Sequence, residues 1–185
     1  MISTLSYLDH SLFFLLNDFV GRSAFFDALI IFCAVWLQYP LIAALLVVLW
    51  CRRESVRENI RTLGEWVAAV VLSRLIITTA IRFFYHRPRP FVALGLHPLV
   101  FDASWSFPSG HAAFFFALAA SVYFYEKKWG QWLYAAAIII CASRVIAGVH
   151  YPSDILGGAM VGIASAYLIH YVCVPLFIRR IPPHA

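Results

Sequence analysis

Five long apolar segments limit what this chain can fold into, because each is about as long as a bilayer is thick. They run through residues 24–50, 65–84, 109–126, 131–149 and 154–178. A helix needs about 20 mostly apolar residues to cross the hydrocarbon core of a membrane. Only 12% of the residues are charged, whereas soluble domains carry about 25%. The sequence therefore predicts an all-α integral membrane protein, with residues 1–185 forming a single domain built as a bundle of five to six transmembrane helices.

Residues 1–21 are more polar than the five apolar segments. Asp9, His10, Asn17 and Asp18 interrupt their apolar residues. We expect this stretch to form an amphipathic helix that lies at the membrane interface. A sixth, oblique span is the alternative.

The basic residues indicate how the bundle is oriented. A net charge of +5 would suggest a nucleic-acid partner in a soluble protein. Here the basic clusters flank apolar segments: Arg52, Arg53, Arg57, Arg61, Lys127, Lys128, Arg179 and Arg180. Such clusters mark the cytoplasmic side. We therefore expect membrane lipids and no nucleic acid as partners, with residues 85–108 and 148–153 on the extracytoplasmic face.

Three motifs fall on that extracytoplasmic face, and the first is "RFFYHRPRPF" at the end of the second span. It contains Arg82, Arg87 and Arg89, while Pro88 and Pro90 prevent the helix from continuing. Guanidinium groups are planar donors that suit phosphate oxygens. An interfacial cluster that contacts lipid headgroups is the structural alternative.

The second motif is "PSGH", residues 108–111, which begins the third span. The first amides of a helix have no partners within the helix, and the helix dipole favours an anion there. Gly110 permits close approach of a ligand, Ser109 adds a hydroxyl donor, and His111 lies within the first turn. A capped helix with an interfacial histidine would explain the motif equally well.

The third motif, "SRVIAGVHYPSD", contains Arg144, His150 and Asp154. A carboxylate in the first turn of the following helix can accept a proton from Nδ1 of His150. Its Nε2 then stays free as a nucleophile. A structural His–Asp cap is the alternative. On the same face as the other two motifs, this one favours phosphoryl transfer, which depends on positioning and on stabilising charge.

Residues that would hold a metal are scarce on this face. The sequence has no GxxxxGK[ST] loop. Only Asp102 and Asp154 lie near the predicted site, too few carboxylates to hold magnesium. We therefore expect a metal-independent reaction without a cofactor.

Together the motifs resemble the type 2 phosphatidic acid phosphatase family of membrane lipid phosphatases. The family pattern is Lys-x6-Arg-Pro, Pro-Ser-Gly-His and Ser-Arg-x5-His-x3-Asp, and it matches from Arg82, which replaces the family lysine, to Asp154. The resemblance implies that His150 forms a phosphohistidine, that Asp154 orients it and that His111 is the general acid. It also implies a set of phosphate ligands: Arg82, Arg89, Ser109, Gly110 and Arg144.

Within the family, the chain looks most like bacterial undecaprenyl-diphosphate phosphatases of the bacitracin-resistance type. The cues are "RPRPFV", "DAS" before "FPSGH", and "GVHYPSDILGG". The resemblance implies removal of the terminal phosphate of undecaprenyl diphosphate on the outer face of the cytoplasmic membrane, which recycles the carrier lipid for wall synthesis. Phosphatidate, phosphatidylglycerophosphate or lipid A phosphatases are alternatives. Non-catalytic alternatives are an anionic-lipid transporter and a haem-binding bundle using His111 and His150.

Four polar residues near the motifs have no role in this scheme. Arg74 lies inside the second span, where a structural pairing is favoured over substrate contact. Arg87 matches no family position. His97 and Asp102 are expected to be solvated loop residues, with a place at the rim of the site as the alternative.

Overall fold

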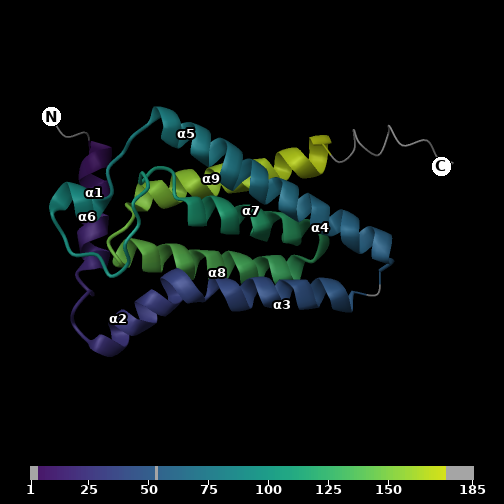
Figure 1. The fold of residues 1–185 in the computed structure, drawn as a ribbon, viewed down its shortest axis with the longest axis horizontal. Helices are drawn as coiled ribbons and strands as arrows, with labels where there is room; N and C mark the ends of the chain where they lie inside the picture. The colour runs from purple at the N-terminus through teal and green to yellow at the C-terminus, as the bar shows by residue number, and fades with distance from the viewer. Residues whose placement is uncertain (1–3, 53, 174–185) are drawn as a thin grey trace.

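The computed structural model describes residues 4–52 and 54–173, and every regular element in these ranges is helical (Figure 1). The α-helices are α1 (Thr4–Asn17), α2 (Ala24–Ile31), α3 (Gln38–Cys51), α4 (Val56–Val70), α5 (Thr78–Phe84), α6 (Pro90–Leu94), α7 (Gly110–Tyr125), α8 (Lys127–Ile146) and α9 (Pro152–Leu168). Three π-helical segments continue them: η1 (Phe32–Trp36), η2 (Val71–Ile77) and η3 (Ile169–Cys173). The all-α prediction is confirmed, while the end of the predicted fifth span and the basic pair 179–180 lie outside the described residues.

Three helices are long and apolar enough to cross a bilayer: Val56–Phe84, Lys127–Ile146 and Pro152–Val172. The first has 29 residues because η2 joins α4 to α5 without a break. It begins before residue 65 because the Ser55 hydroxyl accepts a hydrogen bond from the Glu58 amide and caps a polar first turn. α7 is also apolar but shorter, with 16 residues.

The apolar segment 24–50 forms a broken helix. α2 with η1 meets α3 at an angle of 46°, and the two parts together could make a fourth span. Pro40 lies in the first turn of α3, where it has no N–H to continue the hydrogen bonds of the preceding helix. The side chain of Gln38 donates to the carbonyl of Val35, 2.8 Å away. The bend therefore has a local cause in the sequence.

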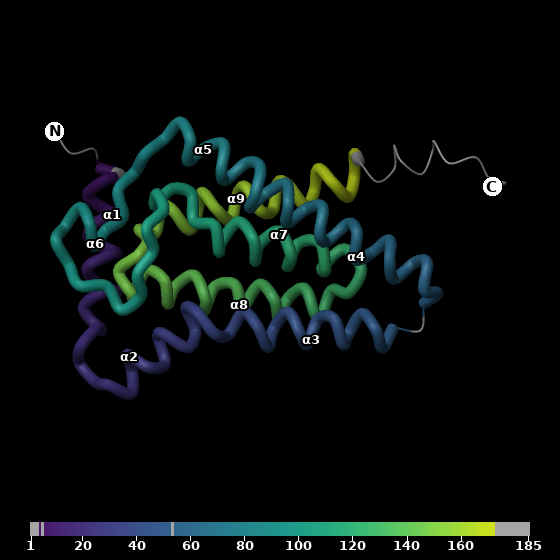
Figure 2. The backbone as a smooth tube through the Cα atoms, in the orientation of Figure 1, coloured from purple at the N-terminus to yellow at the C-terminus, as the bar shows by residue number. Residues whose placement is uncertain are grey.

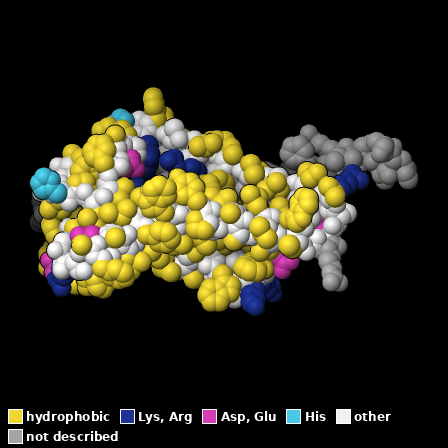
Figure 3. Space-filling model, turned by 60° about the horizontal axis from the view of Figure 1, so that its bottom comes forward, with side chains coloured by type: hydrophobic (Ala, Val, Ile, Leu, Met, Phe, Trp, Pro, Cys, Tyr) yellow, Lys and Arg dark blue, Asp and Glu magenta, His cyan; other side chains and the backbone are white. Residues whose placement is uncertain are grey.

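The helices run along one long axis and leave connections at both ends of the bundle (Figure 2). One end carries the α3–α4 and α7–α8 connections. The other carries α6, the segment 95–109, the turn 147–151, and α1, which lies across the bundle (Figure 1). Hydrophobic side chains cover most of the surface between the ends, and arginines gather in a recess toward the end with α1 (Figure 3). We call the end with α1 and α6 the site end.

Close packing between α7 and α9 fixes the residues at their N-termini. Gly158 faces the carbonyl of Ser109 and Gly162 faces that of Ala113, so closely that a Cβ atom on either glycine would collide with α7. Small residues permit this approach between membrane helices. The amide of Ser109 also donates to the backbone carbonyl of Asp154 at 2.9 Å. The first turns of α7 and α9 therefore lie side by side at the site end.

Candidate active site

Direct hydrogen bonds join the three predicted motifs at the site end. Arg89 donates from Nη1 to the carbonyl of Val149 at 2.7 Å, and the same nitrogen lies 3.2 Å from Nε2 of His150. Arg82 donates from Nε and Nη2 to the carbonyl of Pro108, at 3.2 and 2.8 Å. With the α7–α9 contact described above, each motif touches the other two. The predicted convergence is therefore present in the fold.

His150 lies in the turn between α8 and α9, and it is only 1% exposed. Its Nδ1 is 3.5 Å from Oδ2 of Asp154, which is longer than a well-formed hydrogen bond. Its Nε2 faces Arg89, and a guanidinium can only donate. Burial lowers the pKa of His150 to about 4, although Asp154 opposes the shift. Near pH 7 the ring is therefore neutral, and its contacts favour the tautomer with the lone pair on Nε2.

The Asp154 carboxylate is completely buried and held by several donors. Oδ2 accepts from the Tyr151 amide at 2.8 Å and from the Ser106 hydroxyl at 2.5 Å. Oδ1 accepts from Nη1 of Arg87 at 2.7 Å. A buried carboxylate needs such partners to stay ionised. The group that faces His150 is therefore a fixed anion.

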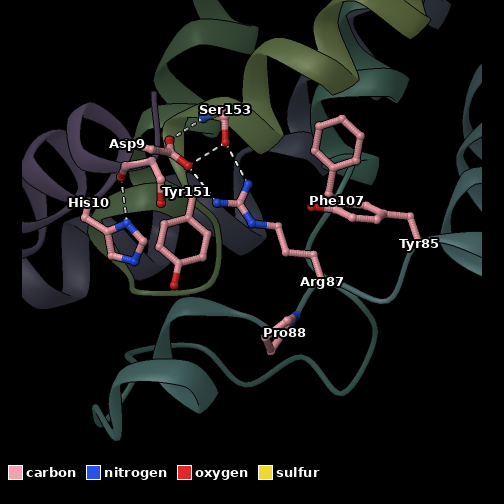
Figure 4. A pocket seen from close by; sticks show the side chains of 9 residues that line it. Asp9, His10, Tyr85, Arg87, Pro88, Phe107, Tyr151 and Ser153 are labelled. Carbon is pink, nitrogen blue, oxygen red and sulfur yellow. Dashed lines mark hydrogen bonds and ion pairs between the residues drawn. The ribbon is translucent and has the colours of Figure 1, made fainter. Parts of the chain in front are cut away.

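Arg87, which matched no family position, lies between the carboxylates of Asp154 and Asp9, and Figure 4 shows its contact with Asp9. Its Nη2 is 2.6 Å from Oδ2 of Asp9 in α1, and its Cζ lies 4.1 Å from the centre of the Tyr151 ring. Asp9 also accepts from the amide and hydroxyl of Ser153, at 2.9 and 2.6 Å. Burial would lower the pKa of Arg87, but Asp154 and Asp9 outweigh it and raise the pKa. Arg87 is thus the counter-ion of Asp154, and it ties α1 to the site.

Asp102 lies across two of the arginines that were predicted to bind phosphate. Its Oδ2 is 2.7 Å from Nη2 of Arg89 and 3.1 Å from Nη2 of Arg144. Ser104 donates to Oδ1 from its amide and hydroxyl, at 3.0 and 2.8 Å. Burial alone would raise the pKa of Asp102, but Arg89 and Ser104 lower it to about 2. The expectation of a solvated loop residue is therefore wrong for Asp102, because its loop folds onto buried cations, whereas His97 is exposed as expected.

Arg144 lies in the last turn of α8 and is 3% exposed. Besides its contact with Asp102, it donates from Nη1 to the carbonyl of Ala34 at 3.4 Å. Its Nε is buried and has no hydrogen-bond partner among the described residues. A buried N–H is rarely left without an acceptor. The guanidinium therefore has a donor to spare for a ligand.

The "PSGH" motif forms the start of α7, as the sequence predicted. Ser109 is the N-cap, and its hydroxyl oxygen accepts from the Ala112 amide at 3.4 Å. Gly110 and the half-buried His111 line a cavity of about 310 Å³. His111 interacts electrostatically with both His150 and Arg144. The motif is therefore in electrostatic contact with the third motif, while the cavity that it lines is shared with Arg74 and with residues of the broken helix 24–51.

The predicted site residues all lie at the site end: Arg82, Arg89, Ser109, Gly110, His111, Arg144, His150 and Asp154. Four further polar partners had no sequence prediction of a role in the site: Asp9, Arg87, Ser104 and Ser106. Ser104 and Ser106 precede the "PSGH" motif, a local signal that could have identified them, whereas Asp9 is 78 residues from Arg87. No group of three or more His, Cys, Asp or Glu in the described ranges could hold a metal ion.

Known proteins share both the sequence pattern and the fold. A family model described as the PAP2 superfamily matches residues 64–177, which include every predicted site residue. "Putative undecaprenyl-diphosphatase YbjG" of Escherichia coli (strain K12) is 33% identical over 170 residues, 89% of this chain and 84% of that protein. "Bacitracin transport permease protein BcrC" of Bacillus licheniformis is 28% identical over 173 residues, 92% of this chain and 83% of that protein.

The crystal structure of Aquifex aeolicus LpxE superposes with a TM-score of 0.71 and 27% identity. The match covers 88% of this chain and 94% of that one. The family model thus covers more than half of the chain, and both a relative matched over most of its length and a solved structure agree with it. The chain belongs to the PAP2 superfamily.

Proposed function

We propose that this PAP2 lipid phosphatase removes the terminal phosphate of undecaprenyl diphosphate, without a metal ion and through a phosphohistidine on His150. The observation that carries the proposal is the state of His150, a buried neutral ring with Nε2 toward the arginines and Nδ1 toward Asp154. The name of the relative YbjG, an undecaprenyl-diphosphatase, supports the choice of substrate.

In the first step, Nε2 of His150 attacks the terminal phosphorus, and the bond from this phosphorus to the bridging oxygen breaks. His111, which carries a proton when the anionic substrate lies beside it, donates this proton to the departing oxygen of the lipid phosphate. The phosphorylated ring keeps its proton on Nδ1 and is positively charged, so the fixed carboxylate of Asp154 stabilises it. The arginines stabilise the charge on the equatorial oxygens, which is the main demand of phosphoryl transfer.

In the second step, water attacks the phosphorus of the phosphohistidine. His111, now deprotonated, accepts a proton from the water, and the phosphorus–nitrogen bond breaks. Inorganic phosphate leaves and His150 returns to its neutral form. Each histidine ends the cycle in its starting protonation state.

Phosphate and the Asp102 carboxylate cannot accept hydrogen bonds from the same guanidinium nitrogens at the same time. Asp102 uses Nη2 of both Arg89 and Arg144. We therefore expect the terminal phosphate to displace this carboxylate when substrate binds. Asp102 is 29% exposed at its side chain and belongs to the segment 95–109 outside the helices, so it can move toward solvent without unfolding a helix.

We further propose that the site lies on the outer face of the bacterial cytoplasmic membrane. The opposite end of the bundle carries Arg52, Arg57, Arg61 and Lys127, and positive loops stay in the cytoplasm. α1 has 14 residues, fewer than the about 20 that a span requires. Its course across the site end suits a helix at the outer interface (Figure 1). A phosphatase in this orientation would recycle the carrier lipid used in wall synthesis.

Phosphate release by the purified protein tests the proposal. The substrates are undecaprenyl diphosphate, phosphatidate, phosphatidylglycerophosphate and lipid A, each with and without EDTA, and the His150→Ala variant is the control. We expect fastest release from undecaprenyl diphosphate, no effect of EDTA and no release by the variant. Preference for a diacyl monophosphate would contradict the substrate, and loss with EDTA that magnesium restores would contradict the mechanism. Lipid transport that survives in His150→Ala, or haem absorbance, would favour the non-catalytic alternatives.

A further inference from the structure

Arg74 is a cation inside a membrane-spanning helix, and the structure gives it no protein partner. It lies in η2, within the helix Val56–Phe84. It makes no hydrogen bond and no ion pair with any residue that the structure describes. Charged residues inside the membrane normally pair with an opposite charge or line a functional cavity. The structural pairing that the sequence favoured is therefore not found within the ranges 4–52 and 54–173, and another role for Arg74 has to be considered.

The guanidinium of Arg74 packs against the first residue of α7. A Cβ atom at Gly110 would lie 2.5 Å from Nε and 2.6 Å from Cζ of Arg74. A side chain at position 110 would displace the guanidinium from this place. Arg74 is thus held beside the helix start where the sequence predicts an anion, next to His111.

The polar part of the 310 Å³ cavity consists of Arg74, Gly110 and His111 together with the side chains of Gln38 and Tyr39. Ile42, Phe114 and Phe115 form an apolar part of the same cavity. A charged group joined to a hydrocarbon chain would match both parts. The cavity therefore suits the portion of a lipid where the headgroup meets the tail.

Electrostatics distinguish Arg74 from the other arginines of the site. Arg89 and Arg144 share the Asp102 carboxylate. Arg74 interacts repulsively with both of them and with Arg82, and no carboxylate pairs with it among the described residues. Its position is therefore electropositive and open to an anion.

The larger cavity beside α1, of about 570 Å³, offers a useful contrast (Figure 4). It also contains an arginine, Arg87, but that guanidinium already contacts Asp9 and Asp154. An anion there would have to compete with two carboxylates that are both buried. Of the two cavities, the one at Arg74 is therefore the better anion site.

We propose that Arg74 binds the phosphate nearest the lipid in a diphosphate substrate, and so makes the enzyme selective for lipid diphosphates over lipid monophosphates. The inference rests on the proposed function in one respect, that His150 attacks the terminal phosphate while His111 protonates the leaving oxygen. The anion beside His111 and Arg74 is then the leaving group. With a diphosphate this group is a lipid phosphate that gains negative charge as the bond breaks, and Arg74 stabilises that charge. A monophosphate has only an alcohol there.

The test compares kcat/KM for a polyprenyl diphosphate and for the matching polyprenyl monophosphate in wild type, Arg74→Met and Arg74→Lys. Losing a charged hydrogen bond should reduce kcat/KM for the diphosphate by about ten- to hundred-fold in Arg74→Met. The loss for the monophosphate should be much smaller, and Arg74→Lys should recover part of the diphosphate activity. Arg57→Met, an exposed arginine in α4 at the opposite end, is the matched control and should leave the ratio unchanged.

Failure of the inference is separable from failure of the proposed function. Wild-type enzyme that prefers the monophosphate would overturn the diphosphatase proposal and the inference with it. Wild-type enzyme that prefers the diphosphate, while Arg74→Met keeps the same ratio, would overturn only the role of Arg74. Equal losses on both substrates would also overturn it, because they would assign Arg74 to the terminal phosphate or to folding.

Discussion

Two buried polar clusters lie toward opposite ends of this bundle, and they differ in how their charges are balanced. Away from the site, Glu65 accepts a hydrogen bond from the Tyr125 hydroxyl at 2.5 Å, and its other oxygen lies 2.6 Å from Nδ1 of His170. At the site end, arginines outnumber the carboxylates that they face: Arg74, Arg82, Arg87, Arg89 and Arg144 against Asp9, Asp102 and Asp154.

The difference separates a structural cluster from a binding cluster. Both oxygens of Glu65 are used within the protein, so this cluster is complete without a ligand. Within the described part of the chain, the site end keeps an unpaired guanidinium at Arg74 and a buried Nε without a partner on Arg144. Such groups are costly in a low dielectric unless an anion binds them. The excess of unpaired positive charge therefore indicates that the site end binds an anion.

The largest effect is expected where the chemistry takes place. His150→Ala removes the nucleophile and should reduce phosphate release by at least ~10³-fold. Asp154→Asn should cost ~10²- to 10⁴-fold, because an amide no longer fixes the Nδ1 proton or stabilises the phosphorylated ring. Both rates are measured on protein whose helicity by circular dichroism matches the wild type. Normal release by His150→Ala would contradict the role of this residue.

A smaller loss of activity is expected for substitution of Arg144, whose buried Nε has no hydrogen-bond partner among the described residues. In the Arg144→Gln variant, the glutamine side chain is too short to make the same contacts and carries no charge. Removing a charged hydrogen bond of ~1.5–3 kcal/mol should lower kcat/KM by about ten- to hundred-fold. Steady-state kinetics with the diphosphate lipid measure this loss, and unchanged kcat/KM would mean that the phosphate does not contact Arg144.

Asp102→Asn probes the carboxylate that already occupies the site. Removing its charge frees Arg89 and Arg144, so a larger fraction of the protein is ready to bind phosphate. We expect KM to fall by about three- to tenfold, in proportion to that fraction. Inorganic phosphate should also inhibit the variant more strongly. A higher KM would show instead that Asp102 holds the arginines in their binding geometry.

The pH response of His150 follows from its burial. With a pKa of about 4 in the folded protein and about 6.5 in an unfolded chain, the ring should stay neutral from pH 7 down to about 5. Above pH 6.5 the group does not affect the free energy of unfolding. As pH falls from about 6.5 to 4, the unfolded chain takes up the proton first and folding is destabilised. NMR titration of histidine-labelled protein, with His150→Ala to identify the signal, measures the pKa, and a midpoint above 6 would contradict it.

The smallest effect on activity is expected at the balanced cluster. Glu65→Gln should leave kcat/KM within about twofold, as for a substitution away from the chemistry. It should lower the midpoint of thermal unfolding by about 2–4 °C, because His170 and Tyr125 lose a charged partner. A large loss of activity with unchanged stability would give this end a catalytic role and remove the contrast between the two clusters.

The sequence predicted those parts of the structure that depend on local pattern. The lengths of the apolar segments predicted the long helices, and the motif with Pro108 and Gly110 predicted the start of α7. The helix Val56–Phe84 starts earlier than its apolar stretch, because a polar turn capped by Ser55 precedes that stretch. Spacing alone placed Asp154 in the first turn of a helix and His150 just before it, and in the structure Nδ1 of His150 lies 3.5 Å from Oδ2 of Asp154.

What the sequence could not predict depends on contacts between distant segments. The pairing of Arg87 with Asp9 requires α1 to lie across the bundle end. The position of Asp102 requires a loop to fold back over Arg89 and Arg144. Arg74 was expected to find a partner because buried cations usually do, but it packs against Gly110 and pairs with no residue in the described ranges. No hydrophobic period or motif encodes these contacts.

Rapid chemical quench of a single turnover tests the central claim most directly. The substrate is polyprenyl diphosphate labelled in its terminal phosphate, and the protein is recovered in base, where phosphohistidine persists, and then digested. The account predicts acid-labile label on the peptide that contains His150, and none with His150→Ala. Full turnover without label on the protein, or label on a peptide without His150, would contradict it.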